Sequence, residues 1–269
     1  QSDTTQGWID ASGFTAAVGQ NQIIPGESGM PMMAVAGFGT TQARSRARFH
    51  LAAALATLPK GSYRLEGDLP EAIDAEALGA LLTGYKFTRY AGKPYNGAIL
   101  VAPNGVDANR IEILANSEAL TRDLINTPAS DMGPSALDAA ARDLAGAFDA
   151  KIDVTEGEDL LKANFPMIHA VGRAAEDAPR LIDMRWGNTG PKLTLVGKGV
   201  CFDTGGLNLK PGASMGLMKK DMGGAATVLG LARSIMALNL RLQLRVLIPA
   251  VENAVAGNAF RPGDILTSR

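Results

Sequence analysis

Strand-like and helix-like hydrophobic patterns alternate through the first 108 residues of the chain. The predicted elements are a buried strand over 30–39, an amphipathic helix over 40–58, a short strand over 61–67, a helix over 70–91 and a short strand over 96–103. Thr40 or Thr41 is the expected N-cap of the first helix, and Pro70 is expected in the first turn of the second. Alternation of this kind is typical of an α/β domain.

Two long helical patterns follow and then a second α/β pattern begins. The first helix is predicted from Asn109 to Asn126 and ends at Thr127-Pro128, and the second covers 133–148. The later predicted elements are a strand over 151–156, a short helix, buried strands over 179–186, 192–197 and 240–251, and an apolar, buried helix over 222–239.

These patterns predict an α/β protein of two domains, each a mixed sheet flanked by helices. Residues 1–108 form the expected N-terminal domain, 109–148 form bridging helices, and 149–269 form the first part of a second domain. That second domain is expected to be incomplete, because the sequence stops just after a central-looking strand and a turn. An open sheet edge at that point would be a liability unless something covers it.

Composition narrows the class of protein only slightly. The net charge of −1 gives no bulk electrostatic argument for binding nucleic acid or a membrane surface. There is no run of 18 apolar residues, so no membrane span is expected. Cys201 is the single cysteine, which excludes an internal disulfide and favours a reducing compartment. We interpret Cys201 as a core residue in preference to a nucleophile.

The segment from Gly197 to Gly224 places four lysines and two aspartates between two strongly apolar stretches. Lys198, Asp203, Lys210 and Asp221 are all expected near strand and helix ends that face one crevice, where sites of α/β proteins usually lie. Asp221 is the expected cap of the helix that follows.

Three interpretations of this segment compete. Phosphate binding fails, because neither G-x-x-x-x-G-K-[ST] nor G-x-G-x-x-G occurs there. Ion pairs that close a loop explain two lysines and two aspartates without any function. Metal binding is the other interpretation, because carboxylates suit Mg, Mn or Zn and can bridge two ions. A neutral lysine amine can be a further ligand, and a charged lysine can stabilise an oxyanion.

The strings "VGKGVCFDTGGLNLKP" and "MGLMKKDMGGAATVLG" resemble the signature of the leucine aminopeptidase (cytosol aminopeptidase) family of dinuclear metallo-exopeptidases. The strings "LTRDLINTPASDMGPSAL", "AVGRAAEDAPRLIDMRW" and "VENAVAGNAFRPGDILT" resemble the same family, in the same order. The resemblance covers Asn109 to Arg269. Residues 1–108 resemble the variable N-terminal domain of the family only in their alternation and in "YKFTRY".

Carried over by position, the resemblance implies a role for five residues. Lys198 is a metal ligand and Asp203 bridges both metals. Lys210 polarises the substrate carbonyl and holds the oxyanion. Asp221 binds one metal and meets the free amine of the substrate, and Met218 lines the pocket for the first side chain.

The implied function is removal of N-terminal, apolar, leucine-like residues from peptides by a metal-activated hydroxide. The implied cofactors are two divalent ions, Zn or Mn with Mg or Co as alternatives, and a bicarbonate that acts as general base. The family also implies a cytoplasmic homo-hexamer with no membrane partner. Nucleic acid is not indicated, although a non-catalytic DNA-binding or assembly role on the same fold is the alternative hypothesis.

One string of the family is absent from this sequence. The family completes its site with N-T-D-A-E-G-R, which supplies two more carboxylate ligands and an arginine that holds the bicarbonate, and no such string follows "RPGD" here. We therefore expect the remaining C-terminal part of the catalytic domain as a partner, and no activity from residues 1–269 alone.

Four other polar residues have a structural explanation as well as a functional one. His169 lies in an apolar run and His50 on an amphipathic helix, so both are expected to be structural. Glu252 and Asn253 end a strand, and they either support the site or serve plain turn chemistry.

Overall fold

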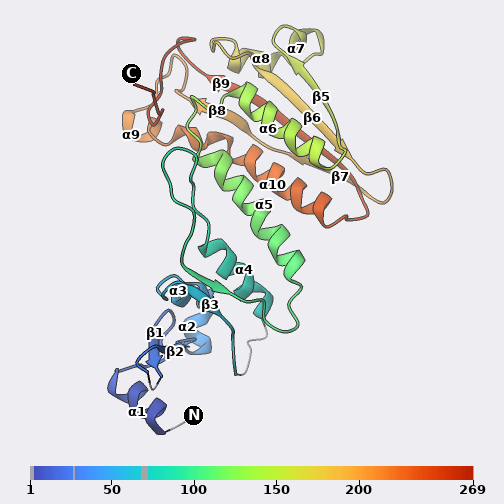
Figure 1. Ribbon diagram of the computed structural model, residues 1–269. Coiled ribbons are helices and arrows are strands. Elements are labelled where there is room, and N and C mark those ends of the chain that lie inside the picture. Colours follow the sequence, from blue (N-terminus) through green and yellow to red (C-terminus); the bar gives the residue numbers. More distant parts are fainter. Residues whose placement is uncertain (1–2, 27, 68–71, 269) are drawn as a thin grey trace. The chain divides into compact units, whose positions relative to one another are not determined.

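The structure of the chain is a computed structural model that describes residues 3–26, 28–67 and 72–268 (Figure 1). Contacts between residues divide the chain into two compact units, residues 1–115 and 116–269. The described elements of unit 1 are α1 (Asp3–Ala11), β1 (Asn21–Pro25), β2 (Pro31–Ala36), α2 (Thr41–Arg44), α3 (His50–Leu55), β3 (Gly61–Tyr63), α4 (Ile73–Thr83) and β4 (Ala98–Leu100). Helix α5 (Ala108–Asn126) begins in unit 1 and ends in unit 2.

In unit 1 the described strands form two separate pairs. Strands β1 and β2 are antiparallel, and strands β3 and β4 are parallel. A buried hydrogen-bonded contact holds helices α3 and α4 together, because His50 Nδ1 lies 2.9 Å from Glu76 Oε1. The other carboxylate oxygen of Glu76 accepts the backbone N–H of Leu51 at 2.8 Å and so satisfies a donor in the first turn of α3. Both groups are therefore structural, as expected for His50.

Unit 2 contains a five-stranded mixed sheet and the helices that pack on it, as Figure 1 shows. Its elements after α5 are α6 (Pro134–Ala147), β5 (Lys151–Glu156), α7 (Asp159–Lys162), α8 (Pro166–Gly172), β6 (Arg180–Trp186), β7 (Lys192–Val196), β8 (Gly199–Asp203), α9 (Gly212–Met215), the 3₁₀ helix η1 (Met218–Met222), α10 (Gly223–Ala237) and β9 (Gln243–Asn253). The α/β class predicted from the sequence is confirmed.

Strand β9 is the centre of this sheet and determines where the site lies. Strand β6 pairs with it antiparallel on one side, and β5 pairs with β6. On the other side β7 and β8 pair with it in parallel, one after the other, so that β8 lies along its last residues, from Ala250 to Asn253. Two short strands therefore occupy one position in the sheet. The chain leaves the sheet between them at Gly197 and Lys198.

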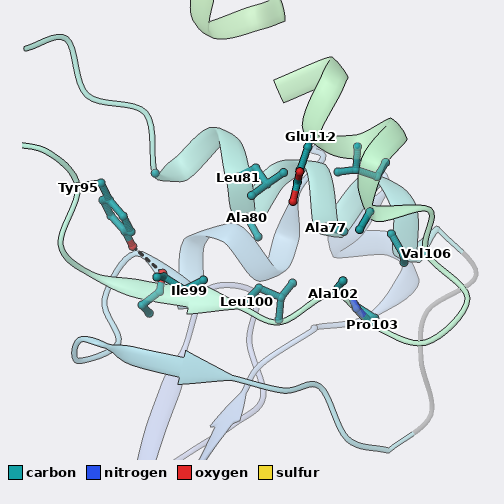
Figure 2. Close-up of a pocket in the computed structure, with 14 residues that line it drawn as sticks. Ala77, Ala80, Leu81, Tyr95, Ile99, Leu100, Ala102, Pro103, Val106 and Glu112 are labelled. Atoms are coloured by element: carbon teal, nitrogen blue, oxygen red, sulfur yellow. Dashed lines mark hydrogen bonds between the residues drawn. The ribbon is translucent and has the colours of Figure 1, made fainter. Parts of the chain in front are cut away.

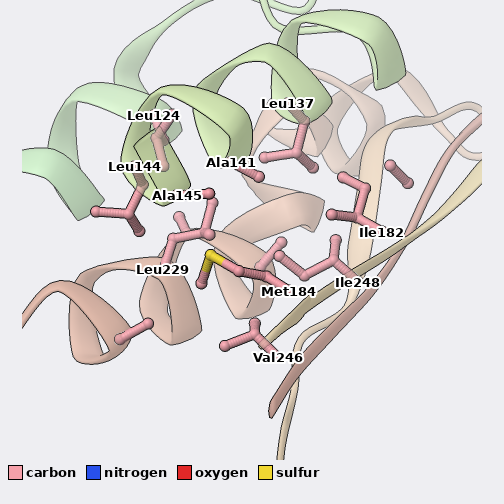
Figure 3. Packing of buried hydrophobic residues seen from close by; sticks show 14 of the residues in the cluster. Leu124, Leu137, Ala141, Leu144, Ala145, Ile182, Met184, Leu229, Val246 and Ile248 are labelled. Carbon is pink, nitrogen blue, oxygen red and sulfur yellow. The ribbon is translucent and has the colours of Figure 1, made fainter. Parts of the chain in front are cut away.

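The main core lies between this sheet and helices α5, α6 and α10 (Figure 3). In β9 every second residue is buried from Leu244 to Ala250, which is the period of a strand with one face on a core. Helix α10 contributes Leu229, whose side chain is 1% exposed, and α6 contributes Leu137 and Ala141. Cys201 belongs to the same cluster, so its interpretation as a core residue agrees with the structure.

Two expectations about the elements differ from the structure. The strand predicted as buried over 30–39 is β2, which has no fully buried residue. The helix predicted over 40–58 is two helices, because Phe49 adopts a left-handed backbone with φ +61° and interrupts it. Thr40 is the N-cap of the first of them, and its hydroxyl accepts the N–H of Ala43. Pro70 lies outside the described residues.

We expect Leu229→Ala to lower the free energy of unfolding of unit 2 by about 2–5 kcal/mol, because it leaves a cavity in a packed core. Urea unfolding followed by circular dichroism measures the change. Leu231→Ala is the matched control on the same helix, because that side chain is 46% exposed and its loss should change little. Equal effects of the two substitutions would contradict the packing described here.

Candidate active site

Lys198 occupies the break between β7 and β8, and its backbone is held by the start of helix α10. The carbonyl oxygen of Lys198 accepts the N–H of Ala225 at 2.9 Å. Two glycines make this close approach possible. A Cβ on Gly224 would lie 2.8 Å from the backbone nitrogen of Lys198, and a Cβ on Gly197 would lie 2.7 Å from Cα of Ala225. The position of the Lys198 backbone is therefore fixed by packing against the start of α10.

Asp203 ends strand β8, and its carboxylate receives three donors. Its Oδ1 accepts the N–H of Gly205 at 2.9 Å and the side-chain amide of Asn253 at 2.8 Å. The Lys210 ammonium lies 3.0 Å from its Oδ2. Burial disfavours the charged form, but the hydrogen bonds from Lys210, Gly205 and Asn253 outweigh it and hold the pKa of Asp203 below its usual value. Asp203 is thus kept as an anion.

The turn after Asp203 brings Lys210 back to it. Gly205 and Gly206 have φ of +89° and +64°, a region that favours glycine, which explains the "TGG" string. The backbone N–H of Lys210 donates to the carbonyl oxygen of Thr204 at 2.9 Å and closes the loop.

Asp221 lies in the 3₁₀ helix η1, just before helix α10. The prediction that it caps α10 is wrong, because the N-cap is Met222 and no side chain caps that end. The Asp221 side chain is 14% exposed, and its Oδ2 lies 2.9 Å from the Lys198 ammonium. The same oxygen is fully buried and receives no hydrogen bond of acceptable angle from any described group. The Lys198 ammonium is thus the cation that lies beside this buried oxygen.

The structure therefore brings the four charged residues together as two pairs, Lys198 with Asp221 and Lys210 with Asp203. The two pairs belong to elements in direct contact, since η1 packs against β8. Met218 begins η1 and is half-buried. That all these side chains share one metal site stays a prediction.

The donor set fits part of a divalent metal site. Two carboxylates that are mostly removed from water, and a lysine amine beside one of them, are chemically suited to Mn or Zn. The buried Oδ2 of Asp221, which has a cation beside it but receives no hydrogen bond, is the observation that favours this fit. Across the described part of the chain, no group of three or more His, Cys, Asp or Glu side chains could hold a metal by itself. The pairs thus supply only some of the ligands that two ions need.

The remaining candidates are structural in this geometry. Burial raises the pKa of the Cys201 thiol, with smaller contributions from Asp177 and Glu252, so the nucleophilic thiolate is disfavoured. His169 pairs with Glu158 at 3.1 Å and is 14% exposed, which agrees with a structural role.

Sequence reasoning missed two features of the site. The sequence does not distinguish between turn chemistry and support of the site as the role of Asn253. The structure shows that its side-chain amide donates a hydrogen bond to the carboxylate of Asp203. Arg261 was not singled out, but its guanidinium binds both carboxylate oxygens of Glu252, at 2.6 and 2.5 Å. The only sequence signal for the contact between Asn253 and Asp203 is the presence of an amide side chain at the end of a predicted strand.

The cavities among the described residues include one in each unit, each of about 160 Å³. The cavity in unit 2 adjoins the site, because Phe202 and Thr204 on either side of Asp203 line it, together with Met215 and Phe260. The cavity in unit 1 is mostly apolar and lies between α4, β4 and the start of α5 (Figure 2). None of the predicted site residues lines the cavity in unit 1.

Comparison with sequence models of known families assigns the family of the chain. Residues 119–269 match the sequence model of the cytosol aminopeptidase family, catalytic domain, and residues 1–103 match that of the M17 aminopeptidase N-terminal domain. The chain belongs to the cytosol aminopeptidase family. The resemblance found in the strings of residues 197–224 is confirmed.

Similar proteins carry related names. A probable cytosol aminopeptidase of Corynebacterium diphtheriae is 37% identical over 74% of this chain and 41% of its own length. The crystal structure of cytosol aminopeptidase from Coxiella burnetii is 42% identical, with a TM-score of 0.87 over 98% of this chain and 57% of that one. The bottromycin maturation enzyme BotP in complex with Mn is 32% identical, with a TM-score of 0.80 over 95% and 58%.

The chain spans roughly half the length of these relatives. Among the described helices, none combines the length and the apolar character required to cross a bilayer.

We expect Gly224→Ala to destabilise unit 2 by about 1–3 kcal/mol, because the new methyl group would overlap the backbone of Lys198. Gly146→Ala is the matched control, since a Cβ there meets nothing within 4 Å and alanine favours a helix over glycine by up to about 1 kcal/mol. Urea unfolding of both variants measures the difference. If Gly224→Ala proved as harmless as Gly146→Ala, the close approach of α10 to Lys198 would be disproved.

Proposed function

We propose that the protein that carries this sequence is an aminopeptidase that removes apolar, leucine-like residues from the N-terminus of peptides with the help of two divalent metal ions. The observation that supports this most directly is the pair of lysine–aspartate contacts on β8 and η1, in a chain that belongs to the cytosol aminopeptidase family.

Lys198, Asp203 and Asp221 are the proposed metal ligands in this chain. Asp203 is suited to bridge two ions because its carboxylate is anionic and oriented by three donors. The bound ions, Zn or Mn with Mg or Co as alternatives, would polarise the peptide carbonyl and lower the pKa of a bound water. BotP is described in complex with Mn, which supports a divalent ion in this fold.

Lys210 is the proposed electrophile for the substrate. In the structure its ammonium is paired with Asp203 and is 29% exposed. Cations bound at Asp203 would weaken this pairing, and the ammonium would then be free to donate to the carbonyl oxygen of the scissile bond. A fixed cation at that oxygen stabilises the negative charge that develops there.

Asp221 and Met218 are the proposed determinants of where the enzyme cuts. The mostly buried carboxylate of Asp221, which would bind one metal, is also suited to meet the free amine of a peptide N-terminus. Met218 is half-buried in the same short helix, and its flexible thioether suits an apolar pocket. Together the two residues favour an exopeptidase that prefers apolar residues.

Three further properties belong to the same proposal. The remaining carboxylate ligands and a bicarbonate-binding arginine are expected from an N-T-D-A-E-G-R string, which this sequence does not contain. The resemblance also implies a homo-hexamer, and the name of the relatives supports a cytoplasmic enzyme.

We expect Lys210→Ala to lower kcat for leucyl-anilide hydrolysis by about a hundredfold, because the interaction is made mainly with developing negative charge, while KM changes little. Steady-state kinetics of the protein that carries this sequence, loaded with Mn or Zn, measures both constants. Lys192→Ala is the control, since that lysine is exposed at the start of β7.

Two results of this assay would count against the proposal. An unchanged kcat in the Lys210→Ala protein would remove Lys210 from the mechanism. Absence of leucyl-anilide hydrolysis in the unsubstituted, metal-loaded protein would contradict the proposed activity itself.

A further inference from the structure

The side chain and the backbone of Asn253, at the end of strand β9, form hydrogen bonds with two different residues. The carbonyl oxygen of Asn253 accepts the backbone N–H of Thr204 at 3.0 Å and the Thr204 hydroxyl at 2.8 Å. These two bonds close the turn after β8 without any contribution from the amide of Asn253. The amide nitrogen instead donates to Oδ1 of Asp203 at 2.8 Å. Turn chemistry alone therefore does not explain why an amide side chain is present.

The bond from Asn253 determines which way the Asp203 carboxylate faces. Oδ1 is occupied by Asn253 and by the N–H of Gly205, which leaves Oδ2 for the Lys210 ammonium. A carboxylate can rotate about its last bond, because that torsion is broad. Two donors fixed on one oxygen oppose this rotation, so Oδ2 is presented consistently to whatever cation lies opposite.

A buried ion network anchors the residue next to Asn253. The Arg261 guanidinium binds both oxygens of Glu252, whose side chain is 5% exposed. Asp264 accepts the backbone N–H of Arg261 at 2.8 Å, and its other oxygen accepts the N–H of Ser130 at 2.9 Å. The hydrogen bond to Glu252 raises the pKa of Arg261, so the guanidinium stays charged. Hydrogen bonds thus connect the end of β9 to the loops that contain Arg261 and Ser130, and they fix the position of the strand end that carries Asn253.

We propose that Asn253 is a positioning residue for the metal site: its side-chain amide orients the Asp203 carboxylate so that Oδ2 faces the bound cations. This inference rests on the proposed function, because it assumes that Asp203 is a metal ligand. It goes beyond that function in assigning a role to a residue that itself touches neither metal nor substrate.

The experiment measures binding of Mn²⁺ alone to the protein by isothermal titration calorimetry, together with the temperature of thermal unfolding. Asn253→Leu keeps the approximate shape of the side chain but removes the donor, and Asn253→Ala serves as a second variant that cannot clash. We expect both to bind Mn²⁺ about tenfold to a hundredfold more weakly than the unsubstituted protein, as is usual when the partner of a ligand is lost.

Thr204→Val is the matched control. It removes the hydrogen bond that the Thr204 hydroxyl donates to the carbonyl oxygen of Asn253 and the one it accepts from the N–H of Gly206, but it leaves the amide of Asn253 on Asp203. It should therefore lower the unfolding temperature without weakening Mn²⁺ binding. Unchanged Mn²⁺ affinity in both Asn253 variants, or an equal loss in Thr204→Val, would overturn the positioning role and leave the proposed function intact. No Mn²⁺ binding by the unsubstituted protein would instead contradict the metal site on which the inference rests.

Discussion

The structure of the site depends on one electrostatic constraint: two carboxylates are mostly withdrawn from water and must be compensated. Burying an uncompensated charge costs several kcal/mol, so each carboxylate needs a cation or several donors. In this chain Lys198 compensates Asp221, while Lys210, Gly205 and Asn253 compensate Asp203. Ion pairs that merely close a loop would satisfy the same constraint. Membership of the cytosol aminopeptidase family is what favours a metal site over such a loop closure.

The backbone around these charges is folded so that each lysine can come close to its aspartate. One strand position beside β9 is divided between β7 and β8, and the division places Lys198 where helix α10 begins. Gly197 and Gly224 allow strand and helix to meet there without a clash. Gly205 and Gly206 then turn the chain sharply enough for Lys210 to return to Asp203. Gly197, Gly205, Gly206 and Gly224 are thus explained by the geometry of the charges that they surround.

Patterns with a clear period were predicted well, and short or interrupted elements were not. The alternation in β9 and the apolar surface of α10 are strong signals because both elements face the core. Strand β8 was not predicted, since it has only five residues and lies in a glycine-rich segment. The break at Phe49 could not be read from an alanine-rich helical pattern, because the left-handed backbone there is a tertiary effect.

The site residues themselves could be named from the sequence only through the resemblance of their strings to a family. Spacing placed Lys198, Asp203, Lys210 and Asp221 near one crevice, but it did not indicate which lysine meets which aspartate. The contribution of Asn253 was also undecidable, because the pairing of β8 with β9 depends on contacts about 50 residues apart in the chain, the separation of Asp203 from Asn253.

The most direct test of the account is the anomalous diffraction of crystals of the protein grown with Mn²⁺. The account predicts anomalous density beside the carboxylates of Asp203 and Asp221, with the Lys210 ammonium moved away from Asp203. Density elsewhere, or none at these carboxylates while both lysine–aspartate pairs stay intact, would contradict the claim that the buried charges exist to bind metal.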